Sequence, residues 1–258
     1  MRRALFLLLA LAADAAADPL VLSPSGAERR RALEAGPKDA VVEQLRAAQP
    51  EALFKLARSV IEGLDVYRVR VVKNERIGKE TTGPVEMLVT LREKPYTAVA
   101  SFVSGLGKGR RALFNPAIRS DALRVREPGF VGLFGPLWVR LDNPVLRWQS
   151  NHAPTELGFG HLLDLYENDF RRAEAAGGLT VEHLGFGASG DYCLHVTGPG
   201  KAKELYSYDS RFCVDLARGL PTLVEVRDQQ GFFESFAYSD VEPVTPTSDL
   251  FSVEKAGL

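Results

Sequence analysis

The feature that most constrains the fold is a repeated alternation of apolar and polar side chains with a period of two. It begins after residue 64 and first includes Tyr67, Val69 and Val71, which are separated by Arg68 and Arg70. This pattern is typical of strands that bury one face. Similar runs cover 85–92, 96–102, 112–114, 123–126, 179–184, 191–196, 204–208, 211–216, 222–227 and 231–241. Gly, Pro and Asn residues separate the runs, which favours an antiparallel meander.

Three segments show helical periodicity instead. Two helices are expected over 37–48 and 50–62, each with a proline in its first turn. A third is expected over 156–176, capped by Asn151 or Thr155. Three amphipathic helices are too few to cover both faces of a large parallel sheet. The sequence therefore predicts an α+β fold, mostly antiparallel β: a curled sheet (an incomplete barrel) of about ten strands, with two or three helices covering its concave face.

The N-terminal residues form the three-part pattern of a secretory signal peptide. Arg2 and Arg3 supply a positive start, an uncharged run covers 4–13, and alanines fill 15–17. The apolar run is too short to span a bilayer, which needs about 20 residues. We expect a signal peptide over 1–17, a flexible N-terminal segment over 18–35 and a single domain over 36–258.

Export would place the mature chain in the periplasm or outside the cell, and it would exclude ATP-driven, nicotinamide-dependent and gene-regulatory roles. The composition is that of an ordinary globular protein, with 45% hydrophobic and 25% charged residues. The formal net charge of −1 becomes −2 when residues 1–17, which include Arg2, Arg3 and Asp14, are removed. Such a chain has no overall attraction for nucleic acid. No segment after the signal peptide reaches transmembrane length.

Two cysteines, Cys193 and Cys213, are the only ones in the chain. In an oxidising compartment they can form one disulfide; the alternative is a pair of buried thiols. His183 and His195 lie on two expected strands and could come close to each other. Neither pair has further ligands at a suitable spacing. We therefore expect no metal site and no cofactor.

An apolar, glycine-rich segment over 129–139 has neither helical nor strand periodicity. Its large side chains would make an exposed loop adhesive. Two placements are open: they pack into the core, or they form a movable flap at the mouth of a lipid-sized cavity. The side chains concerned are Phe130, Leu133, Phe134 and Trp138.

Signals of catalysis are weak. No Gly-x-Ser-x-Gly nucleophile elbow occurs, and we expect no catalytic residue and no enzyme activity. The carboxylates of Asp164, Glu167 and Asp169 are expected on the solvated face of the third helix. The polar cluster 151–156 fits helix capping, with a hinge as the alternative.

Several short motifs, taken in order, resemble an exported bacterial family, the domain of unknown function 1571. They are Arg92–Tyr96, Gly109–Arg111, Asn151–Glu156, Val214–Asp215 with Leu220–Pro221, and Glu234 with Tyr238 and Asp240. This family is in turn similar to periplasmic lipoprotein carriers and outer-membrane lipoprotein receptors. The resemblance implies an incomplete antiparallel barrel, with helices over its opening, that encloses an apolar cavity for acyl chains.

We therefore expect a non-enzymatic binding or carrier protein whose partners are acyl chains of a lipid or a lipoprotein and, in addition, other envelope proteins. The side chains expected to line the cavity are Val69, Val89, Phe102, Phe114, Leu163, Tyr166 and Phe170. One alternative is a structural or interaction domain of the cell envelope with a filled core and no cargo. Another is a hydrolase, which would need a serine or cysteine within hydrogen-bond reach of His152, His183 or His195.

Overall fold

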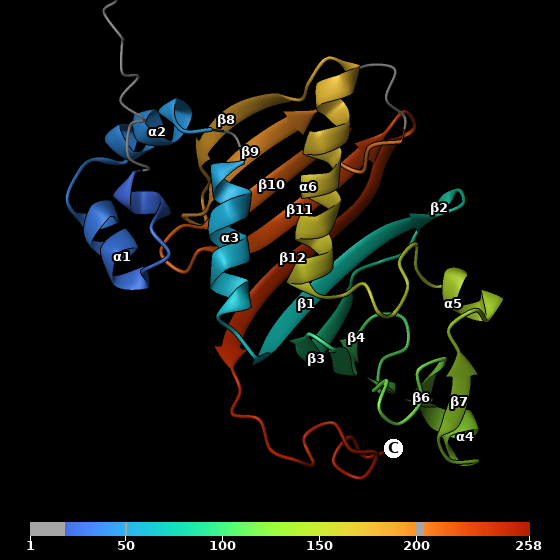
Figure 1. The fold of residues 1–258 in the computed structure, drawn as a ribbon. Coiled ribbons are helices and arrows are strands. Elements are labelled where there is room, and N and C mark those ends of the chain that lie inside the picture. Colours follow the sequence, from blue (N-terminus) through green and yellow to red (C-terminus); the bar gives the residue numbers. More distant parts are fainter. Residues whose placement is uncertain (1–18, 50, 200–203) are drawn as a thin grey trace, which may run out of the picture.

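A computed structural model describes residues 19–49, 51–199 and 204–258. The expected signal peptide lies outside this part of the chain. A sheet of twelve strands dominates the fold, and its pairs are antiparallel throughout (Figure 1). The strands are β1 (Val66–Ile77), β2 (Glu80–Thr81), β3 (Val85–Glu93), β4 (Tyr96–Ser104), β5 (Arg111–Phe114), β6 (Ala122–Arg126), β7 (Leu137–Arg140), β8 (Thr180–Phe186), β9 (Tyr192–Thr197), β10 (Asp209–Asp215), β11 (Leu220–Asp228) and β12 (Gly231–Pro243).

The strands run in the order β7-β6-β5-β4-β3-β1-β12-β11-β10-β9-β8, and the short β2 pairs with β1. Strand β1 therefore lies next to the last strand, β12, and joins the two strand-rich parts of the sequence into one sheet. The sheet curls but does not close, because its end strands β7 and β8 do not pair with each other. The predicted fold class, an incomplete antiparallel barrel with helices on its concave face, is confirmed.

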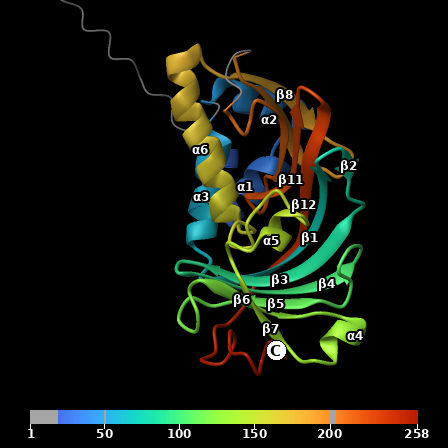
Figure 2. The same cartoon turned by 90° about the vertical axis from the view of Figure 1, so that its right-hand side faces the viewer.

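The helices are η1 (Leu20–Leu22), α1 (Gly26–Glu34), α2 (Lys38–Ala47), α3 (Ala52–Glu62), α4 (Gly129–Gly132), α5 (Pro144–Arg147) and α6 (Phe159–Ala176). The long helices α3 and α6 lie side by side across the concave face of β9 to β12 and β1 (Figures 1 and 2). Among the residues described, no helix combines the length and the apolar character needed to cross a bilayer.

Alternation along the strands explains which side of the sheet is apolar. On β3, buried and half-buried side chains alternate from Val85 to Leu91. On β1, Val69 pairs with Val89 across the sheet, and both are buried. The same inward positions continue along β1 as Val71, then Lys73 and then Glu75, so the apolar face ends in two charged side chains.

Aromatic side chains fill the space between the two long helices and the sheet. The ring of Phe54 on α3 lies 4.9 Å from that of Tyr166 on α6 and 4.7 Å from that of Phe212 on β10. At the N-terminal end of α6, the ring of Phe159 lies 4.8 Å from that of Tyr238 on β12. Because such rings bury large areas in close contact, this half of the concave face is a filled core.

The expectation of a flexible segment over 18–35 is wrong for the described residues 19–35. Val21 is fully buried, and α1 begins at Gly26 behind the capping side chain of Ser25. The guanidinium of Arg29 is also buried and donates hydrogen bonds to backbone carbonyls of the β10–β11 turn, including Leu216 O at 2.9 Å. The polar composition of this segment did not indicate that it is ordered, because Arg29 is buried through hydrogen bonds to backbone carbonyls and not as part of an apolar helix face.

Candidate functional site

An apolar groove lies where helices α3 and α6 no longer cover the sheet. Strands β3 to β7 form its floor, and the segment 145–157, which includes the end of α5, forms its roof (Figure 2). Its cavity volume is about 160 Å³. The apolar side chains of the floor are Val85, Met87, Ala98, Ala100, Phe102, Leu106, Ala112, Phe114, Leu123, Val125 and Val139, and those of the roof are Val145, Leu146, Ala153, Pro154 and Leu157. Lys73, Arg110, Glu127, Gln149, Ser150 and His152 complete the lining.

The structure places the predicted lining residues in two groups. Phe102 and Phe114 line the groove. The others belong to the filled half of the molecule: Val69, Val89, Leu163 and Tyr166 are buried, and Phe170 packs half-buried against Phe54. These five side chains do not line the groove, because Phe54 on α3 packs against Tyr166 and Phe170 on α6.

The largest side chains of segment 129–139 do not pack into the core, whereas Val139 at its end lines the groove. Phe130, Leu133 and Phe134 are 73%, 78% and 72% exposed, and they neither enter the core nor line the groove. Gly129, the first residue of the short helix α4, and Gly135, three residues after its end, adopt positive φ angles that favour glycine. Trp138 follows on β7, where the guanidinium groups of Arg119 and Arg124 lie 5.4 and 5.3 Å from its ring centroid.

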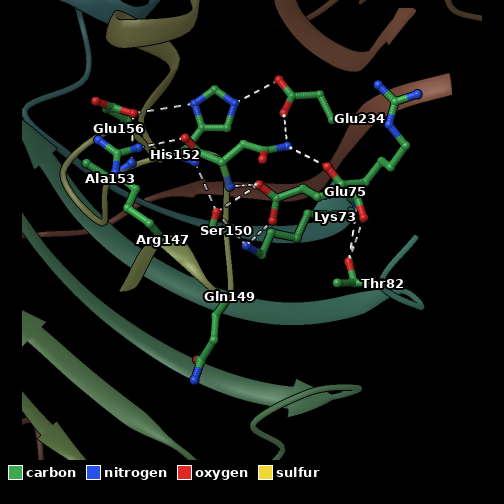
Figure 3. Close-up of polar contacts among 12 residues, drawn as sticks. Lys73, Glu75, Thr82, Arg147, Gln149, Ser150, His152, Ala153, Glu156 and Glu234 are labelled. Carbon is green, nitrogen blue, oxygen red and sulfur yellow. Dashed lines mark hydrogen bonds and ion pairs between the residues drawn. The ribbon is translucent and has the colours of Figure 1, made fainter. Parts of the chain in front are cut away.

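A buried charge cluster lies at the inner end of the groove (Figure 3). Glu75 on β1 is fully buried and binds the ammonium group of Lys73. Its Oε1 accepts hydrogen bonds from Ser150 Oγ at 2.8 Å and from the Asn151 backbone N–H at 2.9 Å. Lys73 Nζ also donates to Ser150 Oγ at 2.9 Å. The cluster therefore anchors the roof segment to the floor of the sheet.

His152 extends this cluster to β12. Its Nε2 lies 2.7 Å from Oε1 of Glu234, another fully buried carboxylate, and its Nδ1 lies 3.4 Å from Oε2 of Glu156 (Figure 3). Burial lowers the pKa of His152, but the hydrogen bond to Glu234 and the charges of Glu234, Glu75 and Glu156 outweigh burial and raise it. The His152 ring thus gives the buried carboxylate of Glu234 a polar partner, as Lys73 does for Glu75.

The remaining chemistry-bearing residues do not form a catalytic pair within the described part of the chain. His183 Nδ1 lies 2.7 Å from the hydroxyl of Tyr192, and His195 Nε2 lies 2.9 Å from Asp209. His183 pairs with Leu194 and not with His195, so the two histidines point to opposite faces of the sheet. No serine or cysteine there contacts a histidine ring nitrogen, as a hydrolase would require.

Cys193 on β9 and Cys213 on β10 face each other in the strand register and form a disulfide. The bond joins neighbouring strands far from the groove and leaves no free cysteine among the described residues. It is a structural cross-link of the sheet.

The family model described as "Protein of unknown function (DUF1571)" matches residues 64–255. The chain belongs to the DUF1571 family. The match begins just before β1 and ends in the C-terminal tail, so it includes the sheet, α6, the groove and the charge cluster. Helices α1 to α3 precede it. Membership confirms the family resemblance seen in the sequence, and no curated protein matches the chain.

Three solved structures are similar to this DUF1571 chain. Mycobacterium tuberculosis lipoprotein LppX is 14% identical, with 76% of this chain and 99% of that chain covered and a TM-score of 0.43. A putative outer membrane lipoprotein-sorting protein domain from Vibrio parahaemolyticus is 12% identical (79% and 96% covered, TM-score 0.37). A LolA superfamily protein from Nitrosomonas europaea is 13% identical (77% and 98% covered, TM-score 0.33). With TM-scores below 0.5, these similarities support no conclusion about function.

The charge cluster of the DUF1571 chain was not predicted, although its signal is present in the sequence. Lys73 and Glu75 continue the inward parity of Tyr67, Val69 and Val71 along β1. Glu234 shares the inward parity of Phe236 and Tyr238 along β12. A charged side chain at an inward strand position must be paired when it is buried. The charged residues at inward positions of β1 and β12 therefore indicated a buried polar site.

Proposed function

We propose that this protein binds one acyl chain of a lipid or a lipoprotein, without covalent chemistry, in the groove between β3–β7 and segment 145–157. The observation that carries the proposal is a mostly apolar lining on the concave side of the sheet, with polar side chains only at Lys73, Arg110, Glu127, Gln149, Ser150 and His152. An acyl chain is flexible, unbranched and wholly apolar, and it fits a narrow groove better than a rigid ring system would.

The size of the groove limits how much of a chain it holds. Its volume of about 160 Å³ is below the range of about 300–1,000 Å³ that is typical of sites for drug-sized ligands. We therefore propose that the groove takes up part of the chain while the rest stays outside. Each methylene moved from water into the groove contributes about 0.8 kcal/mol. Two more buried methylenes should tighten binding about tenfold, until the groove is full.

A substitution on β4 tests this site. Ala100 lines the groove, whereas Val103, farther along the same strand, is exposed and does not line it. Ala100→Phe fills the groove with a ring, whereas Val103→Phe adds a ring to β4 outside the groove. We expect a fluorescent fatty acid to bind the parent and Val103→Phe with equal affinity and Ala100→Phe at least tenfold more weakly. The proposal requires in addition that affinity rise with chain length and then level off.

A filled structural domain without cargo is the competing function, and the packed half beneath α3 and α6 favours it. It predicts no saturable uptake of fatty acids by the parent and no lipid in native mass spectra of the protein after gentle purification. Saturable uptake of a fatty acid would reject the structural domain without cargo, and its absence would reject the acyl-chain site.

We also propose that the protein acts in the periplasm or outside the cell. Residues 1–17 have the composition of a signal peptide, and the Cys193–Cys213 disulfide is of a kind that persists in oxidising compartments. Cell fractionation and N-terminal sequencing test this proposal. We expect the exported chain to begin at Asp18, whereas a cytosolic chain that still carries Met1 or Arg2 would contradict it.

A further inference from the structure

We propose that His152, Glu156 and His161 form a binding site for one divalent transition metal ion of the zinc class. His152 and Glu156 lie on the segment between α5 and α6, and His161 lies in the first turn of α6. Two imidazoles and one carboxylate are a ligand set that zinc accepts, with a water in the fourth position. The site is separate from the acyl-chain proposal and stands or falls independently of it.

The three ligand atoms already converge. Glu156 Oε2 lies 3.4 Å from His152 Nδ1 and 4.0 Å from His161 Nε2, and all three atoms lie within 4.8 Å of one another. Ligands held about 2.0–2.2 Å from a tetrahedral zinc ion are roughly 3.3–3.6 Å apart. Small side-chain rotations of His161 and Glu156 therefore suffice to close the set around an ion.

The surroundings of His152 are those of a metal ligand. Its Nε2 lies 2.7 Å from the buried carboxylate of Glu234, which fixes the ring and leaves Nδ1 facing Glu156 (Figure 3). A carboxylate behind a ligating histidine is the usual arrangement in metal sites, because it sets both the tautomer and the ring orientation. The Ala153 backbone N–H donates to Glu156 Oε2 at 2.8 Å and orients that carboxylate as well.

An ion can reach this set from solvent. The side chains of His152, Glu156 and His161 are 15%, 29% and 33% exposed. The neighbouring group of Glu75, His152 and Glu234 is a poorer candidate. Both of its carboxylates are fully buried, and Glu75 is already saturated by Lys73, Ser150 and the Asn151 backbone.

Bound at this point, the ion would connect the groove's roof to α6. His152, Ala153 and Pro154 line the groove, whereas His161 belongs to the long helix that packs on the other half of the sheet. The sequence-based expectation of no metal considered the cysteines and the pair His183 and His195. It missed this set because the ligands are spread over ten residues and converge only where the segment turns into α6.

The test is titration of the full chain, stripped with EDTA, with Zn²⁺ alone. Isothermal titration calorimetry and native mass spectrometry should both show one ion per chain. His161→Gln removes a ligand, and His183→Gln is the matched control, since both histidines are half-buried. We expect at least a tenfold loss of zinc affinity in His161→Gln and in Glu156→Gln, and no change in His183→Gln.

Thermal melting of each variant in EDTA shows whether it is folded, and Glu156→Gln replaces His161→Gln if that variant is not. Zinc should raise the melting temperature of the parent and of His183→Gln only. Absence of stoichiometric binding to the parent would overturn the proposal. Equal zinc affinity in the parent, a folded His161→Gln and a folded Glu156→Gln would overturn it as well.

Discussion

At the scale of single residues, Arg29 shows how a charged side chain can hold a terminus in place. It is 2% exposed and donates to Ser23 O at 2.6 Å and Pro24 O at 2.7 Å in the N-terminal segment. It also donates to Leu216 O and Arg218 O in the turn between β10 and β11, both at 2.9 Å. The planar guanidinium suits this task because it offers five donors in a rigid fork.

Replacement of Arg29 should therefore destabilise the whole protein. Arg29→Met leaves the buried carbonyls without donors, and hydrogen bonds to charged groups contribute about 1.5–3 kcal/mol. We expect a loss of that size in the free energy of urea unfolding. Arg30→Met is the matched control at the next, exposed position, where a change within about 0.5 kcal/mol is expected. Equal unfolding midpoints for the two variants would contradict this role.

Asp169 is a second residue whose environment differs from the expected one. The sequence placed it on a solvated face of the helix, but it is buried, and its Oδ2 accepts hydrogen bonds from the backbone N–H and the hydroxyl of Ser207. Burial raises the pKa of Asp169 above its usual 3.8, and the Ser207 hydrogen bonds and the charge of Arg172 only partly offset this effect. The folded state thus holds a proton on Asp169 more tightly than the unfolded state does.

This shift predicts a pH dependence with a definite sign. The stabilising contribution of Asp169 is complete below pH 3.8 and is lost as the pH rises through the raised pKa of the folded state. Asp169→Asn does not titrate. The unfolding free energy of the parent, taken relative to Asp169→Asn, should therefore fall as the pH rises above 3.8 and then become constant. Urea unfolding of both proteins over this range checks the sign, and a difference that grows with pH is the opposite result.

At the scale of elements, the N-terminus of α6 is capped by another part of the sheet. The sequence placed the start of this helix at residue 156 with Asn151 or Thr155 as the cap. The helix begins at Phe159 after Gly158, which supplies no side-chain cap. Glu93 Oε1, at the end of β3, accepts the Gly160 N–H at 3.1 Å instead. A side chain at Gly158 or Gly160 would come within 2.8 Å of the Glu93 carboxylate.

Glu93→Gln should consequently weaken the attachment of α6. The variant keeps the shape of the side chain but removes the negative charge that favours a helix N-terminus, and we expect a loss of about 0.5–2 kcal/mol. Glu174→Gln removes a charge from the exposed face of the same helix without touching this cap and should not be destabilising. Hydrogen exchange of the first turn of α6 is the local measurement. Unchanged protection there in Glu93→Gln would show that the cap contributes nothing.

Elements with strong periodicity could be predicted from the sequence, and those set by distant contacts could not. The predicted bounds of the strands over 85–92 and 96–102 differ from the observed bounds of β3 and β4 by at most two residues. The expected strand over 204–208 is instead a turn leading into β10, although Leu205 is buried and Tyr206 and Tyr208 are half-buried. In segment 129–139, hydrophobicity did not indicate burial: Phe130, Leu133 and Phe134 are exposed.

At the scale of the whole molecule, the sheet has two halves with different uses. The half formed by β1 and β9 to β12 is filled by aromatic contacts from α3 and α6. The half formed by β3 to β7 keeps the groove, and the charge cluster around Glu75 and His152 lies between the two. Sequence alone predicted the curled sheet and an apolar concave face. It could not divide that face, because the division depends on where two helices end in space.

The most direct test of this division is photo-crosslinking with a fatty acid that carries a diazirine near its methyl end, followed by peptide mass spectrometry. The acyl-chain site predicts saturable labelling of peptides from β4 and β5 and from the roof segment 145–157, and the unlabelled fatty acid should compete. Labelling confined to α3 and α6, or labelling that does not saturate, would contradict an acyl-chain site in the groove.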